Sequence, residues 1–340
     1  MTIIGNGKRY NENKFGVEKD FEDDIVASSK TLFGKNTIYI NAKKKIDSKS
    51  LGGTIPDGFF FDFTDLSDPQ FYIVEVELSS HSFYNHVFPQ VTKFFALFKN
   101  TRLQKSLIDK IFSIINTDEV LRSEFRKFLG QVEIYKFLSD ILTSSQNILL
   151  IVDGKINELS EIMETYTDTW GKMVLYLEIR KYISFNDTIY TITPDFETLQ
   201  YEDIDSSVDI DEEDVVEKYN ESYHLDGVGQ NVKDIYQQIK RFASEINSEL
   251  IFNTQKYYIS IKAGKNIAFL KIRNKKVRFI AMMPEERIRE FVRNHQVASL
   301  SQPVQDFYNG PCASVDITTN SNMDEIRVLL EQTLAYNKSI

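Results

Sequence analysis

The sequence is poor in cysteine and in long apolar runs. Only one of its 340 residues, Cys312, is a cysteine, and this excludes an internal disulfide framework and a thiolate metal cluster. Its apolar runs all fall short of the roughly 18 residues that a membrane-spanning helix needs. Residues 1–16 contain neither a signal-peptide hydrophobic core nor a small-residue cleavage site. These absences predict a soluble, cytoplasmic protein with no membrane partner.

Net positive charge is lacking as well. The chain has 50 acidic and 40 basic residues, a net charge of -10 and a pI near 5.1, which argues weakly against binding of nucleic acid. The charge is uneven, however: residues 201–217 carry acids and no bases, whereas residues 256–293 are rich in lysine and arginine. The local electrostatic field of each region, rather than the net charge of the chain, therefore decides which ligands that region can bind.

Common catalytic signatures are also missing. The sequence contains no GxxxxGKS/T phosphate loop, no GxGxxG that opens a helix, no GxSxG turn and no HExxH motif. Any catalytic site must therefore be sought in less conspicuous groups of residues.

Hydrophobic periodicity predicts two domains joined by an acidic linker. In residues 1–199 we expect an amphipathic helix over 17–33 with Val17, Phe21, Ile25 and Leu32 inward. The other predicted elements of this domain are strands at 37–46, 55–63 and 71–78, helices at 81–100, 102–116 and 118–144, a strand at 148–152, a helix near 156–168 and a strand at 173–183. Because the first three strands are consecutive, this order favours a mixed α/β fold.

The remaining residues predict a smaller domain. Residues 231–340 alternate helical and strand patterns and form an α+β unit. Residues 200–230 are the acidic linker, too poor in apolar residues to build a core. Two interpretations of its acidic stretch stay open: a solvated tether, or an internal mimic of nucleic acid that lies on the basic region.

Three carboxylates occur where strands begin and end. Pro56-Asp57-Gly58 opens one apolar run, and Glu75 and Glu77 alternate within the next. Alternation at period two places Glu75 and Glu77 on one face, and a neighbouring strand would bring Asp57 beside them. Such a cluster predicts a site for Mg²⁺ or Mn²⁺ that activates water against a phosphodiester. The alternative is a strand face on which the acids point to water.

This arrangement resembles the core of the PD-(D/E)xK nuclease superfamily, over roughly residues 17–100. The resemblance implies a restriction-endonuclease-like mixed-sheet core in which Asp57 and Glu75 hold the metal, with the Val76 carbonyl as a further ligand. Glu77 stands where the superfamily has lysine, and it would act as a metal ligand or general base. Equally, it could mark a domain that binds nucleic acid without cutting it.

Further residues match the superfamily less closely. A helical acid often lies beside the metal site, and Glu22 or Glu18 matches it, although both could simply favour the helix dipole. Gln90 resembles the glutamine of a Q-x-x-x-Y helix motif, with phenylalanine in place of the tyrosine. His81 and His86 follow the acidic pair, where each is either a phosphate contact or acid–base group, or a structural residue.

Several lysines are candidate nucleic-acid contacts. Lys43 and Lys44 belong to a lysine run that could steer a phosphate backbone, and Lys93 could supply a displaced positive charge. Lys275 and Lys276 lie in a predicted hairpin turn of the second domain. Through residues 257–284, that domain resembles a small uncharacterised domain found after nuclease-like domains, which implies an accessory or recognition role. The alternative for each lysine is a solvated surface charge.

Together these patterns predict a divalent-metal-dependent endonuclease that acts on DNA. The alternative is a catalytically inactive module of the same fold, which binds nucleic acid or a protein partner in a defence or repair complex. A homodimer is attractive for an enzyme that cuts two antiparallel strands, since two-fold symmetry would match the substrate.

Overall fold

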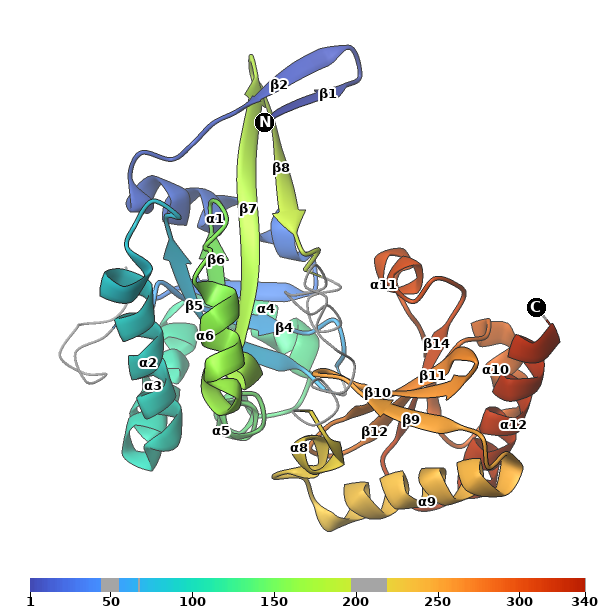
Figure 1. Ribbon diagram of the computed structural model, residues 1–340. Coiled ribbons are helices and arrows are strands. Elements are labelled where there is room, and N and C mark those ends of the chain that lie inside the picture. The colour runs from blue at the N-terminus through green and yellow to red at the C-terminus, as the bar shows by residue number, and fades with distance from the viewer. Residues whose placement is uncertain (44–54, 67, 197–218, 340) are drawn as a thin grey trace. The chain divides into compact units, whose positions relative to one another are not determined.

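The computed structural model describes residues 1–43, 55–66, 68–196 and 219–339 (Figure 1). The chain forms two compact units, Met1–Leu199 and Gln200–Ile340, which are described separately. Lys44 and most of the acidic linker lie outside the described residues. Within the described residues, no helix combines the length and the apolar character needed to cross a bilayer.

The first unit is built around a mixed sheet. Its strands are β1 (Thr2–Gly5), β2 (Lys8–Glu12), β3 (Thr37–Asn41), β4 (Gly58–Asp62), β5 (Gln70–Glu77), β6 (Asn147–Val152), β7 (Val174–Ser184) and β8 (Asp187–Thr193). The strand order is β1-β2-β7-β6-β5-β4-β3, and β8 pairs with β7. The strands β3, β4 and β5 are antiparallel, whereas β5, β6 and β7 are parallel. The mixed α/β class predicted from the sequence is therefore confirmed.

Helices cover both faces of this sheet. They are α1 (Glu18–Phe33), α2 (Phe88–Lys99), α3 (Thr101–Thr117), α4 (Glu119–Leu129), α5 (Ile134–Ser144) and α6 (Leu159–Thr165), with π-helical turns η2 (Phe83–Val87) and η3 (Thr167–Gly171). Phe60 packs against Phe33 of α1, with ring centroids 5.1 Å apart, and its neighbour Phe61 packs against Phe125 of α4 at 5.0 Å. Because adjacent strand residues point to opposite faces, α1 and α4 lie on opposite sides of β4. The continuous apolar run of β4 follows from this burial on both faces.

Some predicted elements differ from the structure. The single helix expected over 118–144 is two helices, because Gly130 takes a φ of 57° and ends α4. Asp118 begins α4 by accepting a hydrogen bond from the backbone N–H of Leu121. Val17, expected in the core, precedes α1 and is 57% exposed. The strands β1, β2 and β8 were not predicted, because β1 and β2 are only four and five residues long and the apolar residues of β8 do not alternate regularly.

The second unit has its own antiparallel sheet. The strands are β9 (Ile251–Thr254), β10 (Ile259–Ala263), β11 (Lys265–Ile272), β12 (Val277–Ala281), β13 (Gln296–Ser299) and β14 (Ala313–Ile317), in the order β13-β14-β12-β11-β10-β9. The helices are α8 (Glu221–Leu225), α9 (Gln230–Ile246), α10 (Glu285–Phe291), α11 (Gln302–Phe307) and α12 (Met323–Ser339). Ile235, Ile239 and Phe242 of α9 belong to its hydrophobic core, as their helical spacing predicts.

Candidate metal centre

Asp57 is held between β3 and β5 at the point where β4 begins. Its backbone N–H donates to the Val74 carbonyl at 3.1 Å, and its carbonyl accepts from the Ala42 N–H at 3.0 Å. Its carboxylate Oδ2 accepts from the Val76 N–H at 2.6 Å. The Pro-Asp-Gly step therefore places a buried carboxylate against the edge of β5, next to the strand that carries the other two acids.

Glu75 and Glu77 are both buried in the second half of β5, with 2% and 1% of their surfaces exposed. The Glu75 Oε2 atom has no hydrogen-bond partner among the described residues. Glu77 Oε1 contacts His81 Nδ1 and accepts from the Leu78 N–H at 3.3 Å. An unpartnered buried carboxylate oxygen is costly, so its presence indicates a place where a cation or proton is accommodated.

The backbone of Val76 faces Asp57. A strand residue directs its N–H and its carbonyl toward the same neighbour, and the Val76 N–H donates to Asp57. The ladder with β4 starts with Gly58 opposite Val74, so β4 does not extend as far as Val76. The Val76 carbonyl thus points toward the side on which Asp57 lies. This direction is the one that a metal ligand at Val76 would need.

Two acids of α1 complete a second side of the centre, which lies at the end of β5 near this helix (Figure 1). Oxygen atoms of Glu18, Glu22 and Asp57 lie within 4.8 Å of one another. The Lys43 ammonium sits among them: it is 3.3 Å from Glu18 Oε1 and 2.7 Å from Glu22 Oε1, and it forms an ion pair with Asp57 Oδ1. We expected Lys43 to steer a phosphate backbone. In the structure its ammonium pairs with three carboxylates, in a place where a metal cation could also be held.

Burial raises the pKa values of four acids of the centre. Burial raises the pKa of Asp57 to about 6, although Lys43 acts against this rise. Burial and then the charge of Asp57 raise the pKa of Glu22 to about 7. Burial also raises the pKa of Glu77 to about 7, and that of Glu75 well above its ordinary value. Near neutral pH the centre therefore holds protons that an entering cation would release.

Tyr39 is a residue of the centre that the sequence did not reveal. Its ring lies over Gly58, so closely that a Cβ atom at that glycine would be 2.5 Å from Tyr39 Cζ. Burial and the charges of Asp57, Glu22 and Glu75 raise the pKa of Tyr39 well above its ordinary value. A glycine directly after Asp57 was the only signal for this close approach, and a turn explains such a glycine equally well.

The other predicted residues lie on α2 and in the second unit. Gln90 is partly buried in the first turn of α2, and Lys93 is exposed on the same helix. Lys275 is exposed in the turn between β11 and β12. Lys276 is buried and lies 2.7 Å from Asp316, so its charge is engaged within the second unit. Of this lysine pair, Lys275 is the one that faces solvent.

Comparisons with protein-family models, curated proteins and solved structures found no match to this chain. The functional argument therefore rests on the geometry of the centre.

The position of Lys43 leads to a testable prediction. Replacing Lys43 by methionine removes a positive charge from among three carboxylates, and we expect Mn²⁺ to bind about tenfold more tightly. Calorimetric titration of the metal-free protein would measure this change. Lys19→Met is the matched control, because Lys19 is exposed on α1 and pairs only with Asp23 among the ion pairs of the described residues. Weaker binding in Lys43→Met would show that the ammonium supports the cation rather than competing with it.

Proposed function

We propose that this protein is a divalent-metal-dependent endonuclease that hydrolyses phosphodiester bonds in DNA. The observation that carries the proposal is the burial of Asp57 and Glu75 at adjoining positions of the sheet, where this burial and then the charge of Asp57 raise the pKa of Glu75 and where Glu75 Oε2 has no hydrogen-bond partner among the described residues. Carboxylate and carbonyl oxygens are the ligands that Mg²⁺ and Mn²⁺ prefer. Asp57, Glu75 and the Val76 carbonyl offer oxygens of this kind, and the carboxylates of Glu18, Glu22 and Asp57 lie within 4.8 Å of one another.

The order of elements also supports the proposal. The helix α1 carries Glu18 and Glu22 and is followed by the antiparallel strands β3, β4 and β5. Asp57 directly precedes β4, Glu75 lies on β5, and α2 with Gln90 follows. This is the order on which the resemblance to PD-(D/E)xK nucleases rests. The departure is Glu77 in the lysine position. In our proposal Lys43 replaces the missing positive charge, because its ammonium already contacts Asp57.

The residues around the centre have separate roles in this proposal. A bound divalent ion would acidify a water molecule and offset negative charge on the scissile phosphate. Asp57 and Glu75 would hold the ion, and the Val76 N–H keeps the Asp57 carboxylate in place. Where no second cation is bound to it, Glu77, with its raised pKa and its contact to His81, would accept a proton from such a water molecule. Lys43 offsets the charge of the phosphate as it approaches.

A second candidate function is binding of nucleic acid without cleavage. It is favoured by one observation, namely that the Glu77 carboxylate is already engaged by His81 and the Leu78 N–H. In such a module the acids would serve only to anchor a structural cation. The two functions differ in whether the bound nucleic acid is cut.

Cleavage assays with the full chain test the proposal. Supercoiled plasmid and single-stranded circles are incubated with Mg²⁺, Mn²⁺ or EDTA, and the products are separated on gels. We expect nicked or linear products with either metal and none with EDTA, since cleavage needs a bound ion. Intact substrate in every condition, from a folded protein that binds the DNA, would refute the endonuclease and favour the binding module.

A further inference from the structure

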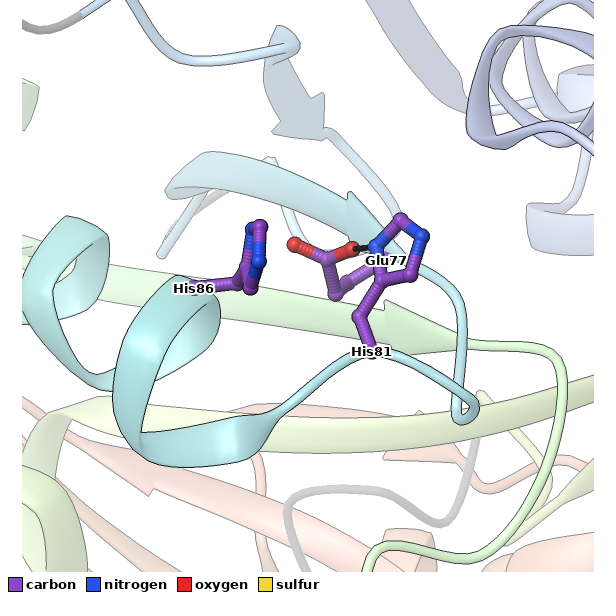
Figure 2. Close-up of side chains that lie close together, drawn as sticks. All are labelled: Glu77, His81 and His86. Carbon is purple, nitrogen blue, oxygen red and sulfur yellow. Dashed lines mark hydrogen bonds and ion pairs between the residues drawn. The ribbon is translucent and has the colours of Figure 1, made fainter.

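A second group of metal-ligating side chains lies beside the carboxylate centre. It consists of Glu77 at the end of β5, His81 in the following turn and His86 in η2, and their ligand atoms all lie within 4.8 Å of one another. Figure 2 shows the Glu77 carboxylate between the two imidazole rings, with one oxygen bonded to His81 and the other directed toward His86. Three potential ligands thus converge from a short segment of chain.

The local backbone explains this convergence. The His81 N–H donates to the Leu78 carbonyl at 3.0 Å and turns the chain directly after β5. The His86 N–H donates to the Ser82 carbonyl at 2.9 Å in the π-helical turn. Phe83 anchors this turn by packing its ring against Trp170, with centroids 5.6 Å apart. The anchored turn brings His86 back toward the end of β5.

The two groups of ligands differ in chemistry. Asp57, Glu75 and Val76 offer only oxygen, whereas the second group offers two imidazole nitrogens and one carboxylate. Imidazole favours Zn²⁺ and other first-row transition ions over Mg²⁺, which strongly prefers oxygen. The second group would therefore select a different ion from the first.

Glu18 connects the two groups. Its Oε2 atom lies 3.5 Å from His81 Nδ1, and its Oε1 atom lies 3.3 Å from Lys43 Nζ. Through Glu18, the His81 and Glu77 pair and the Lys43 and Asp57 pair thus belong to one continuous polar network. A cation bound between the histidines would lie next to the carboxylate centre without sharing Asp57 or Glu75.

We propose that Glu77, His81 and His86 form a second metal site, which binds a divalent first-row transition ion such as Zn²⁺. In a tetrahedral zinc site with bonds of about 2.0–2.1 Å, ligand atoms are about 3.3 Å apart. His86 is exposed, so its ring has room to rotate and close the site. Three protein ligands leave a fourth position for water or a phosphate oxygen. The proposal does not depend on cleavage of DNA, because its ligand set stands on its own geometry.

Titration with Co²⁺, a coloured substitute for Zn²⁺, tests this site in the full chain. The metal-free protein is titrated while the visible absorption of bound Co²⁺ is recorded, and Zn²⁺ is then added to displace it. We expect His81→Ala and His86→Ala each to weaken Co²⁺ binding by at least about tenfold, with loss of the wild-type spectrum. His295→Ala is the matched control, because His295 is in the second unit. This control should bind Co²⁺ as the wild type does.

The outcomes separate this site from the proposed endonuclease. Equal Co²⁺ affinity in wild type and His86→Ala would overturn the second site, as would an equal loss in His295→Ala. Circular dichroism checks that the histidine variants are folded. We expect Asp57→Asn to retain the Co²⁺ spectrum, since Asp57 is not a ligand of this site; loss of that spectrum would overturn a separate site. Absence of DNA cleavage by the wild type would refute the endonuclease and leave the Co²⁺ result intact.

Discussion

Replacing Asp57 by asparagine is expected to reduce metal-dependent DNA cleavage by about 10³-fold or more, equivalent to ~4 kcal/mol of transition-state stabilisation. The reason is electrostatic, because asparagine removes a negative charge from the ion's donor set. The asparagine carbonyl oxygen can still accept the hydrogen bond from the Val76 N–H, so the local fold should persist. Initial rates of plasmid nicking with Mg²⁺ and with Mn²⁺ measure the effect.

The matched control for this variant is Asp62→Asn. Asp62 ends the same strand that Asp57 precedes, and its carboxylate accepts a hydrogen bond from the Thr64 N–H. The Asp62→Asn variant also loses one negative charge, but outside the metal centre. Its cleavage rate should therefore equal that of the wild type. Undiminished cleavage by purified Asp57→Asn would show that the activity arises elsewhere or from a contaminant.

The placement of Asp57, Glu75 and Glu77 along their own segments of chain could be predicted from the sequence. The alternation of Glu75 and Glu77 within an apolar run indicates one shared face, and both are buried in β5. The Pro-Asp-Gly step indicates the start of a strand, and β4 begins at Gly58. Both signals are local, because period and turn chemistry depend only on neighbouring residues.

The contacts between distant segments could not be predicted. Lys43 pairs with Glu18 and Glu22 of α1 and with Asp57, which precedes β4. Tyr39 of β3 covers Gly58 of the adjacent strand β4. These contacts depend on strand register and on how α1 packs, neither of which has a short-range sequence signal. The lysine run looked like a solvated steering patch because its composition alone does not show that Lys43 pairs with three carboxylates.

The crowding of acids in the metal-free centre should cost stability. The pKa of Asp57 is raised to about 6 and those of Glu22 and Glu77 to about 7, so these three groups bind more protons in the folded protein than in the unfolded chain. Carboxyl groups of this kind favour unfolding as they ionise. Their effect is absent below the unfolded pKa values of about 4 to 4.5 and grows until the pH has passed the folded values of about 6 to 7. Stability of the metal-free protein should therefore fall as the pH rises through this window, and a bound cation should offset the loss.

Glu75→Gln tests this trade between stability and function. Burial, and then the charge of Asp57, raise the pKa of Glu75 well above its ordinary value, so a neutral glutamine should relieve the repulsion. We expect the metal-free variant to be about 1–3 kcal/mol more stable than the wild type at pH 8, with a smaller difference at pH 5. Urea unfolding at both pH values, with and without Mn²⁺, measures this.

The same variant should lose the stabilisation that Mn²⁺ gives to the wild type, because it lacks a charged ligand. The control Glu133→Gln removes an exposed carboxylate in the same unit and should change stability by less than about 0.5 kcal/mol. A metal-free Glu75→Gln protein that is less stable than the wild type at pH 8 would mean that the Glu75 carboxylate is a structural group. Greater stability together with lost Mn²⁺ response would mean that folding tolerates this buried charge only because the bound ion compensates for it.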